Sequence, residues 1–496
     1  MTIKQASDRR TEGGSADQAV VAAPTELRRA LTLTHVVLYG LGVTIGAGIY
    51  VLVAAAASRA GMHAPIAFVA AGLLMGLTGL SLAELGVRMP VAAGEAAYAR
   101  AAFHSERIAA FVGLLCIAMS LVSAATISVG AAGYIAVFIP APDKVLIAAV
   151  VLSMGAIAAR GILESVSFAG VMTLIELGGL AMVIVAGFLF EPDVISRVPE
   201  VLPLTADAGV WSGIFTASLL AVFAFIGFEG IVNIAEEVKD PSRTLPRAII
   251  YTLAISTILY VLVMWVALIA VGPAELAASN APIALVFERL TGASPRTMSA
   301  IAIVATLNGI VVNIIMASRI LYGLSRQGVL PRAFGQISAA TQTPLLSTAV
   351  SVVIVLFFSL LLPIAQLADL SARFTLAMFS LINLVLVRIK MRDEPNPKCE
   401  FRCPQWVPLA GFLCCLLFIF FDFVVLARAN PAIGPSRLCP TAARHRLGGG
   451  ARDAARCPRR PLRSQTPARC TSSAWSRCSR APDHGSRGGP PPARKR

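Results

Sequence analysis

Charged residues are scarce in this chain of 496 residues. Asp, Glu, Lys and Arg make up 14% of it, whereas hydrophobic residues make up 56%. Soluble domains contain about 25% charged residues. Long apolar runs recur along the sequence. These features exclude an ordinary soluble enzyme and predict an all-α polytopic membrane protein.

The sequence also lacks the usual patterns of a catalytic or metal site. It has no nucleophile elbow, no Walker loop and no partners for its histidines at catalytic spacing. The nine cysteines do not form a zinc pattern, so we expect those of the apolar body to be packing residues. The first 30 residues are polar, without the apolar stretch of a signal peptide. We therefore expect neither an enzyme nor a cofactor or metal.

Positive charge is concentrated at one end of the chain. Residues 428–496 carry fifteen arginines and Lys495 against Asp453 and Asp483, which accounts for nearly all of the net charge of +15. This tail is rich in Pro, Gly and Ser, so we predict that it is disordered. Its only aromatic residue is Trp475, and we therefore expect no nucleic-acid partner. Three parts are predicted: a polar cytoplasmic segment 1–30, a membrane domain 31–427 and the tail 428–496.

Eleven apolar spans are predicted, each near the 20 residues that cross a bilayer. Eighteen Lys and Arg residues fall on the side of the N-terminus and five on the other side. Basic loops stay inside, so the N-terminus is predicted in the cytoplasm and the protein in the plasma (inner) membrane. The spans are roughly 33–57, 65–88, 107–138, 144–160, 167–190, 210–235, 247–271, 297–322, 345–363, 368–388 and 406–427.

Two spans contain residues that interrupt a helix. The first holds Gly40, Gly42, Gly46 and Gly48, and each glycine costs a helix about 1 kcal/mol relative to alanine. The sixth holds a similar segment, 221–231. Interrupted backbone at membrane depth is tolerated only inside protein or beside a wet cavity. We predict discontinuous spans 1 and 6 that form one site between two inverted units of five spans, with spans 3, 8 and 10 completing the cavity.

The two breaks predict a site for a zwitterion. Amide groups at the start of the outer half of span 1 attract a carboxylate. Carbonyl groups at the end of the outer half of span 6 accept hydrogen bonds from an ammonium group, and two phenylalanines would wall the pocket. The alternative for the glycines is close helix packing. The predicted substrate-binding residues are Thr44, Ile45, Gly46, Ala47, Gly48, Phe223, Ala224, Phe225, Ile226 and Phe228.

The sequence resembles the amino acid permeases of the amino acid–polyamine–organocation (APC) superfamily over roughly 30–427. The similar segments are 44–50, 84–98, 224–229, 235–248 and 317–331. The resemblance implies twelve spans, a five-plus-five inverted repeat, alternating access and Phe228 as a gate candidate. Here only eleven spans are found. It also implies secondary transport of amino acids, either proton-coupled or by exchange. The alternatives are transport of polyamines or cationic amino acids, and an amino acid sensor that does not transport.

Ionisable groups inside the spans are costly and therefore point to function. Glu229 either pairs with a cationic group, takes a proton or anchors its helices. Glu176, where proton-coupled relatives often carry a lysine, either carries the coupling proton or helps to bind a cation, since a buried carboxyl group tends to hold its proton. Asn308 either faces Glu176 or packs, and Arg373 either snorkels or pairs with a carboxylate. The expected partners are an amino acid, membrane lipid and a proton; the oligomeric state is open.

Overall fold

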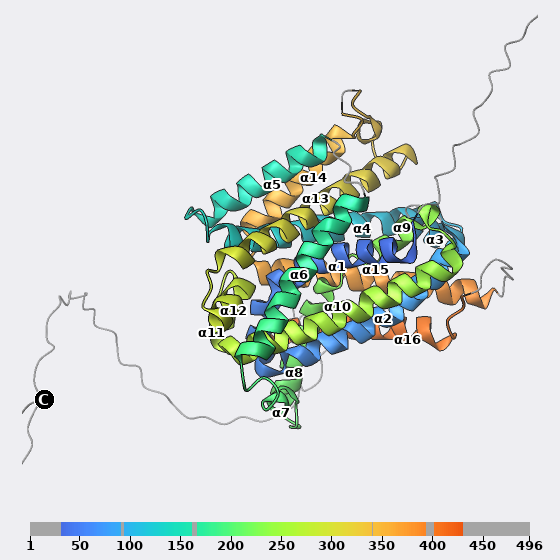
Figure 1. Ribbon diagram of the computed structural model, residues 1–496. Helices are drawn as coiled ribbons and strands as arrows, with labels where there is room; N and C mark the ends of the chain where they lie inside the picture. The colour runs from blue at the N-terminus through green and yellow to red at the C-terminus, as the bar shows by residue number, and fades with distance from the viewer. Residues whose placement is uncertain (1–30, 91–93, 161–165, 340, 393–400, 430–496) are drawn as a thin grey trace, which may run out of the picture. The chain divides into compact units, whose positions relative to one another are not determined.

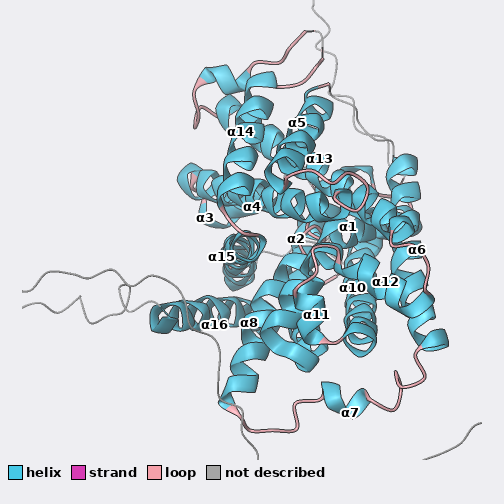
Figure 2. Cartoon of the chain, turned by 90° about the vertical axis from the view of Figure 1, so that its left-hand side faces the viewer, coloured by secondary structure: helices cyan, strands magenta, loops and turns pink. Residues whose placement is uncertain are grey.

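A computed structural model describes residues 31–90, 94–160, 166–339, 341–392 and 401–429. All of them belong to the first of two units into which the chain divides, Met1–Gly434. The predictions for segment 1–30 and for residues 430–496 of the tail therefore lie outside the described residues. Within the described part the secondary structure is helical throughout, with one isolated β-bridge and no strand (Figure 2).

Every predicted span is found as a helix, and most ends agree within a few residues. Seven helical segments of the described chain have the length and composition to cross a membrane, and shorter apolar helices accompany them. The helices at the predicted spans are α1 (Leu33–Ala60), α2 (Ala64–Arg88), α4 (Glu106–Ile135), α5 (Asp143–Ala159), α6 (Val166–Phe190), α8 (Ala208–Ala224) with α9 (Gly230–Asn233), α10 (Pro241–Val271), α13 (Arg296–Arg326), α14 (Leu345–Leu361), α15 (Ile364–Met391) and α16 (Trp406–Ala429).

Short helices and local capping fix the ends of the long ones. The connecting helices are α3 (Gly94–Phe103), α7 (Val198–Val201), α11 (Pro273–Ala277) and α12 (Pro282–Thr291). Asp207 caps α8 by accepting a hydrogen bond from the amide of Gly209 at 2.8 Å. Gly272 ends α10 with φ 84°, a conformation that favours glycine.

Four of the five pairs of corresponding spans in the two predicted units pack against each other. Helix α1 contacts α8, α2 contacts α10, α4 contacts α13, and α5 contacts α14. Figures 1 and 2 both show α5, α13 and α14 grouped together, and Figure 1 shows α6 crossing α1. A two-fold axis between two inverted units would produce this pairing. The repeat itself stays a prediction.

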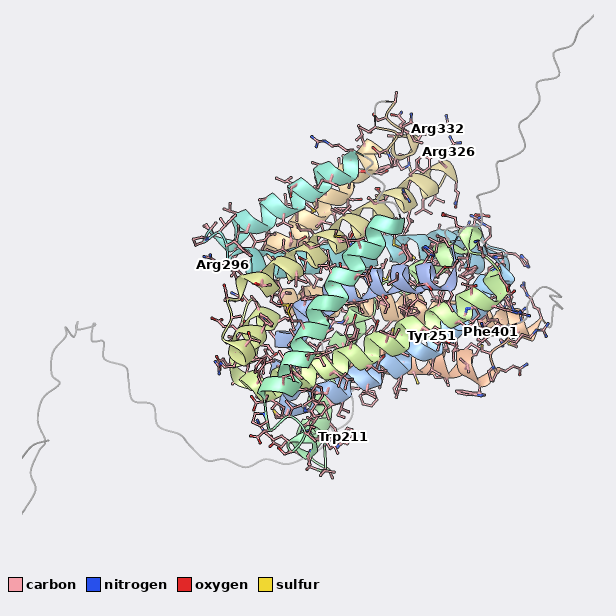
Figure 3. The ribbon with its side chains drawn as sticks, viewed as in Figure 1. Trp211, Tyr251, Arg296, Arg326, Arg332 and Phe401 are labelled. Carbon is pink, nitrogen blue, oxygen red and sulfur yellow. The ribbon has the colours of Figure 1, made fainter. Side chains whose placement is uncertain are left out.

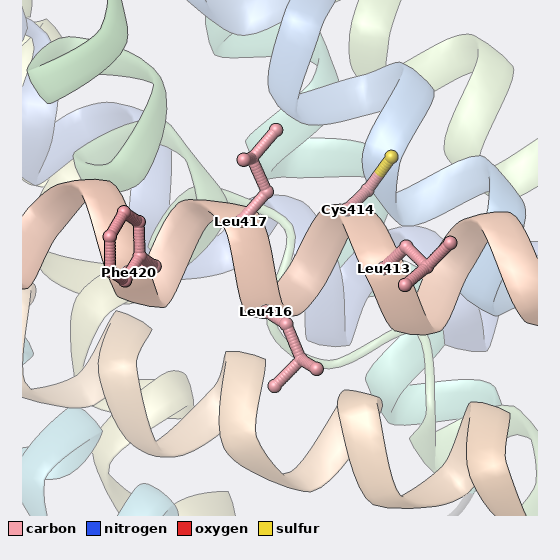
Figure 4. A pocket seen from close by; sticks show the side chains of 5 residues that line it. All are labelled: Leu413, Cys414, Leu416, Leu417 and Phe420. Atoms are coloured by element: carbon pink, nitrogen blue, oxygen red, sulfur yellow. The ribbon is translucent and has the colours of Figure 1, made fainter.

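The outward faces of the helices are apolar. Phe111 on α4, Leu152 on α5 and Phe357 on α14 are each more than half exposed. On α16, an open groove is lined by leucines, a cysteine and a phenylalanine (Figure 4): Leu413, Cys414, Leu416, Leu417 and Phe420. Apolar surface on so many helices fits a lipid environment rather than water.

Basic residues mark the two ends of the helical bundle. Arg296 and Arg326 lie at opposite ends of α13, and Arg332 lies beside the Arg326 end (Figure 3). The loop charges predict Arg326 and Arg332 on one side of the membrane and Arg296 on the other. In the structure Arg296 likewise lies at the opposite end of α13 from Arg326 and Arg332. The cytoplasmic position of the Arg326 end stays a prediction.

A buried charge cluster joins α2, α15 and the segment before α16. Glu84 is fully buried, and its two oxygens lie 2.8 Å from Arg88 Nη2 and 2.8 Å from Lys390 Nζ. The backbone amide of Cys403 also donates to Glu84, at 2.9 Å. Lys390 donates in turn to the carbonyl oxygen of Cys403. The cluster thus ties the last two described helices to the end of α2.

We expect Glu84→Gln to lower the free energy of unfolding by roughly 3–5 kcal/mol, because it leaves Arg88 and Lys390 buried without their negative partner. Thermal unfolding of the purified protein in detergent measures this loss. The control is Glu200→Gln, which removes an exposed ion pair with Arg197 and should change little. Equal unfolding temperatures for the two variants would contradict the structural role of the cluster.

Candidate functional site

Helix α1 crosses the centre of the bundle without a break. The prediction of a discontinuous first span is therefore wrong for this structure, in which α1 is helical from Leu33 to Ala60. Its glycines permit close contact instead. A Cβ atom on Gly48 would lie 2.4 Å from the Cα of Ala224, and one on Gly42 would lie 2.1 Å from Oγ1 of Thr173. The packing alternative explains these glycines, because only hydrogen fits in such contacts.

The predicted break in the sixth span is confirmed. Helix α8 ends at Ala224, a turn follows, and α9 begins at Gly230. Gly227 has φ 124°, and a Cβ atom there would lie 2.5 Å from the carbonyl oxygen of Val43 on α1. The amide of Gly227 donates to Oε2 of Glu229 at 2.8 Å. Among the roles considered for Glu229, this contact supports that of a local anchor.

A small cavity lies where α1 passes the break after α8. The volume of the cavity is about 20 Å³, which is enough for one water molecule. Helices α4 and α13 complete it, as predicted for spans 3 and 8. Span 10, which is α15, contributes indirectly, because Ser371 Oγ lies 2.6 Å from Ser123 Oγ. The lining residues are Val43, Thr44, Gly48, Ser123, Ile127, Phe223, Ile226, Gly309 and Asn313.

Four of the ten predicted binding residues line this cavity: Thr44, Gly48, Phe223 and Ile226. Thr44 is 1% exposed, and its hydroxyl group has no hydrogen-bond partner among the described residues. The cavity therefore has an unused polar group on α1. Ile45, Gly46, Ala224, Phe225 and Phe228 do not line it, and the side chain of Ala47 is outside the description.

The two phenylalanines predicted to wall the pocket pack elsewhere. The ring of Phe225 lies 5.1 Å from that of Tyr260, and the ring of Phe228 lies 5.4 Å from that of Phe379, measured between centroids. Both phenylalanines are fully buried. The first pair is edge-to-face and the second is tilted, and both contacts stabilise a core, so in this structure the two rings hold the broken span against α10 and α15.

Tyr260 on α10 belongs to the site, although no pattern in the sequence pointed to it. Its hydroxyl oxygen lies 2.9 Å from the carbonyl oxygen of Thr44 and 2.8 Å from that of Ala224. The carbonyl of Phe223 accepts from the amide of Ile226 at 3.2 Å. Two of the carbonyls expected to bind an ammonium group are therefore occupied by the protein itself. A tyrosine in an apolar span carries no signal of this contact.

Glu176 lies on the other side of α1 from the cavity. A Cβ atom on Gly46 would lie 3.3 Å from Oε2 of Glu176 and 3.5 Å from the carbonyl oxygen of Ala305. Gly46 is two residues from Thr44 and so lies about 200° around the helix from it. Asn308, three residues after Ala305 on α13, has a buried side-chain oxygen without a hydrogen-bond partner among the described residues. Glu176 thus faces α1 and α13, and Asn308 shares the face of α13 that Ala305 occupies.

Comparison with known proteins identifies the group to which this architecture belongs. The profile of the amino acid permease family matches residues 31–438. The chain belongs to the amino acid permease family. It is 28% identical to the branched-chain amino acid permease of Bacillus subtilis, over 83% of this chain and 92% of that protein.

Other relatives are named for different substrates. The methylthioribose transporter of Bacillus subtilis is 25% identical over 79% of this chain and 88% of its own length. The vacuolar cationic amino acid transporter 2 of Arabidopsis thaliana is 29% identical over 75% of this chain and 62% of its own length. The match confirms an APC superfamily amino acid permease, and the relatives differ in what they are named for.

One end of α1 in this permease is held by a two-pronged ion pair. Nη1 and Nη2 of Arg59 donate to the two carboxylate oxygens of Asp369 on α15, at 2.7 and 2.8 Å. Nη1 of Arg59 also donates to the carbonyl oxygen of Thr216 on α8, at 3.1 Å. We call these three residues the Arg59 latch. It joins α1, α8 and α15 at the C-terminal end of α1.

The latch continues towards α16. Arg373 lies one turn after Asp369 on α15 and donates to Asp422 on α16, with Nε 2.6 Å from Oδ2. Of the two alternatives for Arg373, the structure shows pairing with a carboxylate. Charges therefore alternate from Arg59 through Asp369 and Arg373 to Asp422, which links α16 to the end of α1.

The other end of α1 is held by backbone. The amide of Leu31 donates to the carbonyl of Glu237 at 3.0 Å, and the amide of Lys239 donates to the carbonyl of Leu31 at 2.9 Å. These bonds make a parallel bridge between Leu31 and Val238, here called the Leu31 bridge. One end of α1 is thus tied to α8 and α15, and the other end to the segment that follows α9.

Glu95 is a buried carboxyl group outside the spans. It lies on α3, is 4% exposed, and Oε1 has no hydrogen-bond partner among the described residues. Burial raises the pKa of Glu95 to about 7. Tyr98 lies one turn further on, and burial together with Glu95 raises its pKa.

We expect Gly48→Ala to abolish substrate binding and to lower the unfolding temperature, because its Cβ atom would overlap the backbone of Ala224. Binding by the purified variant and its thermal unfolding measure the two effects. The matched control is Gly178→Ala on α6, where a Cβ atom meets nothing within 4 Å. Normal binding by Gly48→Ala would show that the contact of α1 with α8 is dispensable.

Glu95 predicts a pH dependence of stability. Its pKa is raised from 4.5 when unfolded to about 7 when folded, so the folded state binds the proton more tightly. Its contribution to stability is therefore fully present below about pH 4.5 and is lost as pH rises through 7. Glu95→Gln keeps the neutral form at every pH. The unfolding temperature of the variant relative to the wild type should rise from pH 5 to pH 8, and a constant difference would refute the assignment.

Proposed function

We propose that this permease carries amino acids across the plasma membrane by secondary active transport, with its N-terminus in the cytoplasm. The observation that carries the proposal is the cavity where α1 crosses the break after α8, with α1 held at one end by the Arg59 latch and at the other by the Leu31 bridge. A site in the middle with separate closures at its two ends is what alternating access requires.

The substrate's charged groups bind where α1 and the break meet. Thr44, Gly48 and Ile226 border the cavity, and the turn after Ala224 brings backbone polar groups to it. In the closed state the amides of α1 belong to a continuous helix, so a carboxylate gains them only when α1 bends. Bending at Gly46 and Gly48 is inexpensive, because glycine favours helix about 1 kcal/mol less than alanine does. Opening of the site and binding are thus coupled.

Release of one closure at a time produces alternating access. We assign the Arg59 latch to the outer side, because α1 runs from the cytoplasmic N-terminus outward, and the Leu31 bridge to the cytoplasmic side. Separation of Arg59 from Asp369 frees α1 and α8 from α15 at the outer end. Separation of Leu31 from Val238 frees α1 from the segment after α9 at the inner end.

Glu176 is the candidate for the coupling proton. It is fully buried, and it faces Gly46, the residue at which α1 bends in this proposal. A proton on Glu176 removes a charge from between α1, α6 and α13, and its loss restores that charge. The protonation state of Glu176 therefore affects the packing of α1. Asn308 serves as a polar neighbour on α13.

Uptake by the purified permease in proteoliposomes tests transport against the alternative of a sensor. We expect labelled amino acid to accumulate inside when the outside is acidic. Binding without either gradient-driven accumulation or counterflow would favour a sensor, and uptake of polyamines alone would favour that alternative substrate.

We expect Asp369→Asn to reduce uptake more than tenfold, because it removes the negative charge and replaces one of the two oxygens that accept from Arg59 with an amide nitrogen that cannot accept. The control is Glu275→Gln, which removes the exposed ion pair with Arg289 and should leave uptake unchanged. Initial rates in proteoliposomes with matched protein content give the comparison. If both variants transport at the wild-type rate, the latch is not part of the mechanism.

Glu176→Gln is expected to abolish accumulation driven by a pH gradient while exchange of internal for external amino acid continues. The reason is that the amide cannot release a proton, whereas the cavity on the other face of α1 is intact. Counterflow and gradient-driven uptake of the same preparation separate the two activities. Undiminished accumulation by this variant would show that a group other than Glu176 carries the coupling proton.

A further inference from the structure

The polar groups in the cavity are all uncharged. Among the nine described residues that line it, the polar side chains are Thr44, Ser123 and Asn313. The hydroxyl of Ser123 is engaged with Ser371, and Nδ2 of Asn313 donates to the carbonyl of Gly309 at 2.8 Å. Among the described residues, the hydroxyl of Thr44 has no hydrogen-bond partner and is therefore left for a ligand.

The rest of the wall is apolar. It is formed by Val43 on α1, Ile127 on α4, and Phe223 and Ile226 at the break after α8. The cavity as it stands has room for one water molecule, so a substrate side chain enters between these walls only when the site opens, and the walls that it meets there are apolar. Burying apolar surface in this way stabilises a complex by roughly 25 cal/mol per Å².

The two carboxylates that a cationic side chain would need are directed elsewhere. Glu176 lies behind α1, next to Gly46, about 200° around the helix from Thr44. Glu229 accepts the amide of Gly227 within its own turn and does not line the cavity. Neither is placed to balance a positive charge inside the cavity, and the described lining offers no Lys or Arg to balance a negative one.

Resting on the proposed amino acid transport, we infer that the permease selects amino acids with uncharged, apolar side chains, and that Ile127, Phe223 and Asn313 determine this selection. The physical reason is the cost of burying an ion without a partner, which is several kcal/mol. The names of the relatives do not make this choice, since they include both branched-chain and cationic amino acids. The inference is based instead on the residues that line the cavity of this chain.

Norleucine and lysine provide the sharpest comparison, because lysine is norleucine with an ammonium group on its terminal carbon. Each is offered as a competitor for binding of labelled leucine to the purified wild-type permease. We expect norleucine to compete at least about 100-fold better than lysine, the ratio that corresponds to roughly 2.7 kcal/mol of lost affinity. Glutamate should compete as poorly as lysine.

The outcomes separate the two proposals. Lysine competing as well as norleucine would overturn the selection and leave amino acid transport standing. Absence of binding and uptake for every amino acid tested would overturn the proposed function itself. The wild-type comparison decides the selection without any variant.

Asn313→Asp provides a second measurement, because it places a carboxylate in the cavity with almost no change of shape. We expect the ratio of norleucine to lysine affinity to fall at least tenfold. The matched control is Asn280→Asp, the same substitution at an exposed position outside the cavity, which should leave the ratio unchanged. An unchanged ratio in a folded Asn313→Asp protein would show that residue 313 does not contact the substrate side chain.

Discussion

The close approach of α1 to the broken sixth span is the contact on which the rest of the structure depends. Gly48 lies against the backbone of Ala224, and Gly227 lies against the carbonyl of Val43. At such short range the two segments exclude side chains and bring backbone polar groups together, and Tyr260 bonds to carbonyls from both. The cavity, the two closures of α1 and the placement of Glu176 all follow from this crossing.

Charge is distributed around the crossing in a consistent way. The cavity has uncharged lining, whereas ion pairs lie towards the ends of the helices, at Arg59 with Asp369 and at Glu84 with Arg88 and Lys390. The pair of Arg59 with Asp369 is partly exposed, so water can take over its hydrogen bonds when the bundle opens, whereas the Glu84 cluster is buried and holds its helices together. An uncharged centre with separable charges at its borders suits a protein that must open each side in turn.

Helix α16 lies outside the ten predicted core spans, yet it is connected to them by polar contacts. Asp422 binds Arg373, and the segment before α16 contributes the amide of Cys403 to Glu84. One contact is near the Arg59 latch and the other at the far end of α2. The eleventh span thus braces α15 at both ends, while its outer face carries the apolar groove of Figure 4.

The sequence by itself determined the helical spans, the break near Gly227 and the family. Apolar runs and glycine in an otherwise apolar span are local signals, and the backbone responds to them locally. Only the tertiary structure decided that α1 is continuous and that Phe225 and Phe228 pack into aromatic pairs. It alone placed Glu176 behind α1 and Tyr260 between two carbonyls. A glycine permits both a break and a close contact, and which occurs depends on the neighbouring helix, Ala224 in this case, 176 residues away in the chain.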